Sequence, residues 1–214
     1  GMQGIITKWN EKEKTGYGLW INEKSELCFR IGRIGKAVET VNTGKPLFRN
    51  VWYRVSVSYN AETGRVHLSQ RPYVTHSNCG FGMSMIWPVE DTEKIITTSI
   101  APGSPASNQN PLLLGASVLD SYSGRNIFGS HFPSLSEPTA LPVHNHKFNG
   151  KIDRPKIVAS ALDVSEIDFI LSGSGISHLP LASRKNIIAA WDFTANIDHN
   201  ASATQIIDSG LFCL

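Results

Sequence analysis

The sequence predicts an all-β fold, a two-sheet antiparallel jelly-roll sandwich with one short helix. Three observations predict it: many short runs rich in β-branched and aromatic residues, turn-forming residues between these runs, and one strongly capped helical segment. The helix is expected over residues 163–172, because Asp163 is a good N-cap and Glu166 completes a capping box with it. Leu162 and Ile167 occupy the two positions of a hydrophobic staple, and a Gly-Ser-Gly run follows the helix.

The first third of the chain consists of short predicted strands joined by polar turns. The first strand is expected over residues 2–9. Two further strands, 17–22 and 26–32, flank a three-residue polar turn and therefore form a hairpin. A strand over residues 36–41 is expected to stop at the turn-forming residues 42–46, which include a glycine and a proline.

The clearest hairpin comes next in the chain. Residues 52–59 alternate apolar or aromatic side chains with Arg and Ser, which is the period-2 pattern of a half-buried strand. A turn that ends at Gly64 follows, and glycine suits the positive φ that such a turn requires. The return strand, 65–70, places Val66 and Leu68 on one face.

The rest of the chain adds strands and two long irregular segments. Residues 101–110 and 130–145 read as loops, and loops of this length usually carry binding residues or decorate a rim. Further strands are expected at residues 93–100, 112–116 (fully buried), 148–158 (with Gly150, Asp153 and Pro155), 185–193 and 205–208. The predicted common core contains Val55, Val57, Val66, Leu68, Leu113 and Ile152.

Composition excludes several classes of partner. The formal net charge of +2 gives no reason to expect nucleic acid, and no apolar run is long enough to span a bilayer. The first residues lack the basic and apolar parts of a signal peptide. Cys28, Cys79 and Cys213 are odd in number and widely spaced, so we expect three reduced thiols and a cytoplasmic location.

The ordered strands resemble the laminin-G-like, concanavalin-A-like jelly-roll family. The resemblance implies one domain over residues 1–214. Four stretches carry it, in this order: residues 3–9 with 18–21, residues 52–59 with the Gly64 turn, residues 111–116, and residues 148–153 with 161–162 and 166–167.

A narrower resemblance is to the middle domain of the N,N-dimethylformamidase large subunit. There, a jelly roll is followed by segments similar to residues 189–193 and 207–210 of this chain. In that family the iron-dependent amide hydrolysis is assigned to a different, C-terminal domain. The resemblance therefore implies a non-catalytic accessory or interaction domain, a fragment that lacks strand material at both ends.

The sequence shows no catalytic carboxylate pair. Glycoside hydrolases of this fold need two carboxylates across a cleft. The laminarinase-like enzymes place them as Glu-x-Asp-x-x-Glu, whereas the acids here fall at Glu90, Asp91 and Glu93. We expect this cluster to be a solvated turn, and a glycoside hydrolase is the least favoured function.

Metal ligands are also sparse. His144 and His146 would share one face of an extended segment, which is a metal-ligand spacing, but no third ligand lies nearby in the sequence. Asp153 alone cannot form a calcium site, and its expected role is to accept hydrogen bonds from neighbouring backbone amides. Pro155 cannot donate to a strand ladder, so it implies a sheet edge or a bulge at this point. We therefore expect no metal and no cofactor.

The aromatic residues suggest the alternative function, a carbohydrate-binding module. Sugar binding uses an aromatic platform with polar neighbours, and Phe81, Trp87 and Tyr122 lie in the irregular middle of the chain where they could form one. The tryptophans in strand-like runs are instead expected in the core: Trp9, Trp20, Trp52 and Trp191. The expected partners are a carbohydrate or another protein domain. We also expect a homodimer, because a jelly roll without an outer strand exposes a sheet edge.

Overall fold

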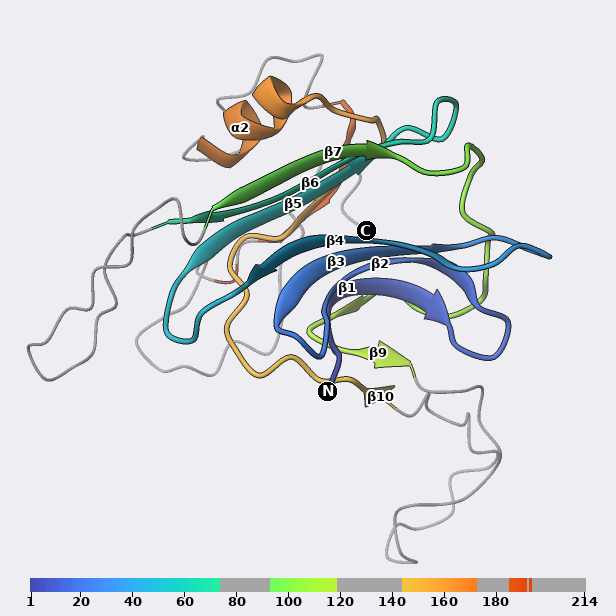
Figure 1. Ribbon diagram of the computed structural model, residues 1–214, viewed down its shortest axis with the longest axis horizontal. Coiled ribbons are helices and arrows are strands. Elements are labelled where there is room, and N and C mark those ends of the chain that lie inside the picture. The colour runs from blue at the N-terminus through green and yellow to red at the C-terminus, as the bar shows by residue number, and fades with distance from the viewer. Residues whose placement is uncertain (74–92, 119–143, 173–184, 192, 194–214) are drawn as a thin grey trace, which may run out of the picture. The chain divides into compact units, whose positions relative to one another are not determined.

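The computed structural model describes residues 1–73, 93–118, 144–172, 185–191 and 193 (Figure 1). Within these residues the chain is built from antiparallel strands and a single α-helix, α2 (Val164–Ser172), which confirms the all-β fold class with one short helix. That helix is too short to cross a membrane, and the described residues contain no other candidate span. The chain forms two compact units: unit 1 holds residues 1–49 and 104–149, and unit 2 holds residues 50–103 and 150–214.

Unit 1 contains a five-stranded antiparallel sheet with the order β4-β3-β2-β1-β8, and a separate two-stranded pair, β9 with β10. Consecutive strands β1 to β4 lie side by side, as Figure 1 shows. The strands are β1 (Gln3–Asn10), β2 (Thr15–Ile21), β3 (Glu26–Gly32), β4 (Glu39–Pro46), β8 (Leu113–Leu114), β9 (Ser117–Val118) and β10 (His144–Asn145).

The β2–β3 hairpin forms as predicted. Its turn is closed by the side chain of Asn22, whose Oδ1 accepts hydrogen bonds from the backbone N–H groups of Lys24 and Glu26, both at 2.9 Å. Ser25 takes a φ of 63° in this turn. The polar residues thus supply the hydrogen bonds that let the chain reverse.

The predicted end of the fourth strand is wrong. β4 begins at Glu39 and continues through the turn-forming residues to Pro46. Two features allow this: Gly44 adopts a φ of 70°, and the pairing with β3 shifts register between Glu26 and Cys28. β4 is also the last strand in the sheet order, and an edge strand tolerates the missing N–H of proline.

Both faces of the unit 1 sheet bury apolar side chains. One face carries Leu19, Leu27, Phe29, Ile31 and Val41, all buried. The other carries a cluster of Trp9, Trp20 and Cys28, against which Met2 and Val38 pack. The indole rings of Trp9 and Trp20 meet edge to face, with centroids 6.5 Å apart, and the guanidinium of Arg30 lies 4.8 Å from the Trp9 centroid. The prediction that these two tryptophans are core is confirmed.

Cys28 is a free thiol within this cluster, as expected. Burial raises the pKa of its thiol to about 11, so the group is neutral at physiological pH. Cys79 and Cys213 lie outside the described residues.

Unit 2 contains a three-stranded antiparallel sheet with the order β5-β6-β7, and a two-stranded pair, β11 with β12. The strands are β5 (Tyr53–Tyr59), β6 (Arg65–Pro72), β7 (Lys94–Ser99), β11 (Lys156–Val158) and β12 (Ile187–Ala190). The predicted strands over residues 93–100 and 185–193 are therefore confirmed, apart from their ends. The predicted strand over residues 205–208 lies outside the described residues.

The β5–β6 hairpin confirms the clearest prediction from the sequence. Val66 and Leu68 are fully buried, and Val55 and Val57 on the same face are half-buried. The turn is closed by Asn60, whose Oδ1 accepts from the backbone N–H groups of residues 62 and 63.

Two predicted strands are much shorter than expected. Only Lys156–Val158 of the segment 148–158 is a strand, because Pro155 cannot donate to a ladder and Arg154 has a φ of 46°, which is not an extended conformation. Only Leu113–Leu114 of the segment 112–116 is a strand, and Gly115, at a φ of 72°, ends it. Leu113 and Ile152, both predicted core residues, are half-buried.

Helix α2 packs on the β11–β12 pair. Ile170 of the helix forms a buried cluster with Ile187 and Ala190, and Val158 and Leu162 pack against it. Leu162, predicted as one half of a staple, therefore contacts the core of unit 2 at the point where the helix begins.

A comparison of two glycines separates backbone strain from steric exclusion. Gly64 and Gly44 have nearly the same φ, 73° and 70°. A Cβ on Gly64 would lie 2.0 Å from the carbonyl oxygen of Ile100, whereas a Cβ on Gly44 would meet nothing within 4 Å. We expect Gly44→Ala to lower the free energy of unfolding by about 1–2 kcal/mol, the cost of left-handed backbone for alanine. Gly64→Ala should cost distinctly more, as measured by urea unfolding, and equal losses would contradict the steric explanation.

Candidate functional site

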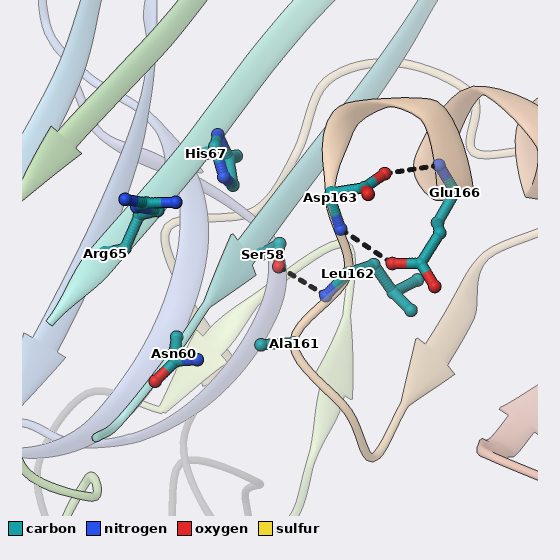
Figure 2. Close-up of a pocket in the computed structure, with 8 residues that line it drawn as sticks. All are labelled: Ser58, Asn60, Arg65, His67, Ala161, Leu162, Asp163 and Glu166. Carbon is teal, nitrogen blue, oxygen red and sulfur yellow. Dashed lines mark hydrogen bonds between the residues drawn. The ribbon is translucent and has the colours of Figure 1, made fainter. Parts of the chain in front are cut away.

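A polar hollow of about 200 Å³ lies in unit 2 beside the start of α2 (Figure 2). The β5–β6 hairpin supplies one side of it, and the segment that enters the helix supplies the other. The lining residues are Ser58, Asn60, Arg65, His67, Ala161, Leu162, Asp163 and Glu166.

The hairpin register brings the first of these side chains together. Ser58 of β5 stands directly opposite His67 of β6, so both side chains project from the same face of the sheet. Arg65 lies two residues before His67 and shares that face. Ser58 Oγ accepts a hydrogen bond of 2.8 Å from the backbone N–H of Leu162, which fixes the entry of the helix to the sheet.

The capping box closes the other side, as the sequence predicted. The backbone N–H of Glu166 donates to Asp163 Oδ1 at 2.8 Å, and the backbone N–H of Asp163 donates to Glu166 Oε2 at 2.9 Å (Figure 2). The hydroxyl of Ser165 also donates to Asp163 Oδ1, at 2.7 Å. The hydrogen bonds from the Glu166 backbone and the Ser165 hydroxyl, in that order, hold the pKa of Asp163 below its usual value.

A second tether holds the helix further along. Arg71 Nη1 lies 2.6 Å from Asp168 Oδ1, and Arg71 Nε lies 2.8 Å from Glu93 Oε1. Glu93 of the acidic cluster therefore forms an ion pair with Arg71 of β6, and the same arginine pairs with Asp168 of α2. Glu90 and Asp91 lie outside the described residues.

The hollow contains the residue types of a Ser-His-Asp triad but not its connections. Nucleophilic catalysis needs a base within hydrogen-bond reach of the nucleophile and a third group that orients the base. Among the described residues no hydrogen bond joins Ser58 to His67, or His67 to Asp163; His67 Nδ1 instead pairs with Thr97 Oγ1 at 2.7 Å. The hydroxyl and the carboxylate both bind backbone N–H groups, so they hold the helix in place.

Sequence reasoning missed this hollow, although part of it could have been found. The turn over residues 60–64 fixes the hairpin register, and that register alone places Ser58 opposite His67. The approach of Asp163 to the same sheet face has no local signal, because it depends on a contact across 104 residues of sequence.

The predicted ligand-binding aromatics, Phe81, Trp87 and Tyr122, lie outside the described residues. A different aromatic pair is exposed in unit 2: Trp52, with 46% of its surface accessible, and Tyr73, with 62%.

Trp52 is therefore not a core residue, contrary to the prediction. Alternation explains why: Trp52 shares its face with Arg54, Ser56 and Ser58, and does not lie on the face that buries Val66 and Leu68. Trp191, which was also expected in the core, is half-buried.

The His144–His146 pair does not form the extended spacing considered for a metal. His146 has a φ of 50°, so the chain is not extended there. Its Nδ1 lies 3.1 Å from the backbone oxygen of Met2, and its ring meets Trp20 edge-on, with centroids 5.9 Å apart. The described residues contain no group of three or more potential metal-ligating side chains.

The capping box makes a pH-dependent prediction. Because the folded-state pKa of Asp163 is lowered, its contribution to stability is complete above the unfolded-state pKa of about 3.9 and is lost as the pH falls through the lower folded value. We expect Asp163→Ala to lower the urea midpoint at pH 7. The difference in midpoint between the variant and the parent chain should shrink progressively below about pH 4. Glu62→Ala in the exposed hairpin turn is the control. A deficit that persists unchanged to pH 2 would show that the charge of the carboxylate is irrelevant.

No family model matches the sequence. The chain is 27% identical over 210 residues to the N,N-dimethylformamidase beta subunit of Alcaligenes sp, and 28% identical over 206 residues to that of Paracoccus aminophilus. These alignments cover 98% and 96% of this chain but 24% of each relative. The chain is thus similar, over nearly its whole length, to about a quarter of the beta subunit of these enzymes.

Proposed function

We propose that this chain is a non-catalytic accessory domain of an amidohydrolase-like protein. The observation that carries the proposal is the similarity over nearly the whole chain to one quarter of the N,N-dimethylformamidase beta subunits. In this proposal the chemistry belongs to a different part of the assembly, and this domain supplies a folded surface.

The hydrogen bonding of the hollow supports a structural role for it. Ser58 Oγ accepts from the Leu162 backbone, and Asp163 accepts from the first turn of α2. Both contacts hold the helix, and among the described residues neither group has the partner that would activate it for acyl transfer.

Activity assays test the non-catalytic role. We expect the purified chain to hydrolyse neither N,N-dimethylformamide nor β-glucan above the rate of buffer, measured by amine release and by reducing ends. The control is the pair of variants Ser58→Ala and His67→Ala, which should leave this background unchanged. Turnover by the parent chain that either substitution abolishes would make the hollow an active site and would defeat the proposal.

The same similarity supports a protein partner. Both relatives are named as subunits, so we propose that this chain acts within an assembly of protein chains. We also propose a two-fold homodimer of the isolated chain. The support is that β5 and β7 end the sheet order in the described part of unit 2, and an edge strand presents backbone N–H and C=O groups that pair readily with another chain.

Light scattering coupled to size exclusion tests the homodimer. We expect twice the chain mass of 23.5 kDa at micromolar concentration, with the monomer appearing on dilution. A single-chain mass at every concentration would contradict the homodimer, and it would leave the proposed role in a larger assembly unaffected.

Carbohydrate binding is the second candidate function. The observation that favours it is the exposed aromatic pair, because sugar rings stack on exposed Trp and Tyr side chains that have polar neighbours. Glycan titration of the purified chain tests it, in the arms described below.

A further inference from the structure

Trp52, Arg54 and Tyr73 form a surface on the polar face of the β5–β6 hairpin, here named the platform. The backbone N–H of Tyr73 donates to the carbonyl oxygen of Trp52 at 2.7 Å, which continues the hairpin ladder and sets the two aromatic residues opposite each other. Arg54 lies two residues after Trp52 on the same face, and its guanidinium carbon stands 4.5 Å from the centroid of the Tyr73 ring.

The guanidinium of Arg54 is held in place, and the described part of the chain supplies no counter-ion for it. Stacking on Tyr73 restricts its position through a cation–π contact. Within the described residues it forms no ion pair and no hydrogen bond, so its N–H donors remain available.

The neighbouring arginine shows the contrast. Arg71 stands directly opposite Arg54 in the hairpin, and like charges at such positions repel. Arg71 is neutralised by Glu93 and Asp168, whereas no carboxylate of the described residues pairs with Arg54. Among the described residues at the open end of the hairpin, Arg54 is therefore the arginine that keeps its positive charge unpaired, beside two exposed aromatic rings.

The chemistry of the platform specifies a ligand with two parts. A guanidinium presents its N–H groups as a fork that matches a carboxylate with two parallel hydrogen bonds. Trp52 presents an apolar ring face and an indole N–H, suited to the C–H face and the hydroxyls of a sugar. Positions two residues apart in a strand lie about 6.6 Å apart, close to the width of one sugar ring.

We propose that the platform binds a pyranose ring that carries a carboxylate, that is, a sugar of the uronic acid class. The ring stacks on Trp52, and the carboxylate pairs with Arg54. This inference rests on the second candidate function, carbohydrate binding, and adds the acidic class of sugar to it. A neutral sugar would leave the charge of Arg54 unused, and a bare inorganic anion would leave Trp52 unused.

Titration of the intact chain with defined oligosaccharides tests the platform. The probes are an oligogalacturonide and a neutral gluco-oligosaccharide of the same length, with sodium sulfate as the bare anion. The readout is the NMR signal of the Trp52 indole N–H, assigned by its absence in Trp52→Phe. We expect the oligogalacturonide alone to shift this signal in a saturable manner.

Variants of Arg54 separate the contribution of its paired N–H donors from that of its positive charge. Arg54→Gln should weaken oligogalacturonide binding on the order of tenfold or more, and Arg54→Lys, which keeps the charge but loses the fork, should restore only part of it. The matched control is Arg65→Gln, an exposed arginine on the same sheet face at the far end of β6, which should leave the affinity unchanged. Since Trp52, Arg54 and Arg65 are surface residues, unchanged amide spectra should verify folding in each variant.

The outcomes distinguish this inference from the function on which it rests. Equal binding of the neutral probe, insensitive to Arg54→Gln, would overturn the acidic class but leave carbohydrate binding in place. A Trp52 shift with sulfate alone would overturn sugar recognition at the platform. Absence of binding by any oligosaccharide would overturn both, and the accessory role within an amidohydrolase-like protein would still stand on its own assay.

Discussion

The register of the β5–β6 hairpin is the constraint on which the rest of unit 2 depends. It pairs Val57 with Leu68 and Ser58 with His67, so one face of the sheet is apolar and the other is polar. A slip of one residue would exchange the two faces, burying Arg54 and exposing Leu68. The turn prevents this, because Asn60 binds two backbone N–H groups and Gly64 takes a positive φ that other residues adopt with strain.

The two ends of the polar face carry different contacts. Near the turn, Ser58 accepts a hydrogen bond from the backbone N–H of Leu162, just before α2 begins. The ion pair between Arg71 and Asp168 holds the helix at a second point. At the open end of the hairpin, Trp52 and Tyr73 stay exposed. The alternation that turns Val55 and Val57 to one face thus places on the other face both the residues that hold the helix and the surface proposed to bind a ligand.

These features agree with the proposed role as an accessory domain. In the hollow, Ser58 and Asp163 accept hydrogen bonds from the backbone where the chain enters the helix, and such hydrogen bonds contribute stability. The chain is similar over nearly its whole length to about a quarter of the N,N-dimethylformamidase beta subunits, and the proposed accessory role rests on that similarity. The platform lies on the open surface of unit 2, where a binding function does not compete with the packing of the core.

The sequence by itself determined the elements whose information is local. Alternation specified the β5–β6 hairpin, and two β-rich runs around a polar turn specified the β2–β3 hairpin. The three-residue spacing of Asp163 and Glu166 specified the start of α2, because the interacting groups are neighbours in the chain. Only the tertiary structure decided where these elements meet. Pro46 remains in a strand because β4 is an edge, and Leu162 reaches Ser58 across 104 residues. Such contacts are selected by packing and by the pairing of buried polar groups, and no short window of sequence contains both partners.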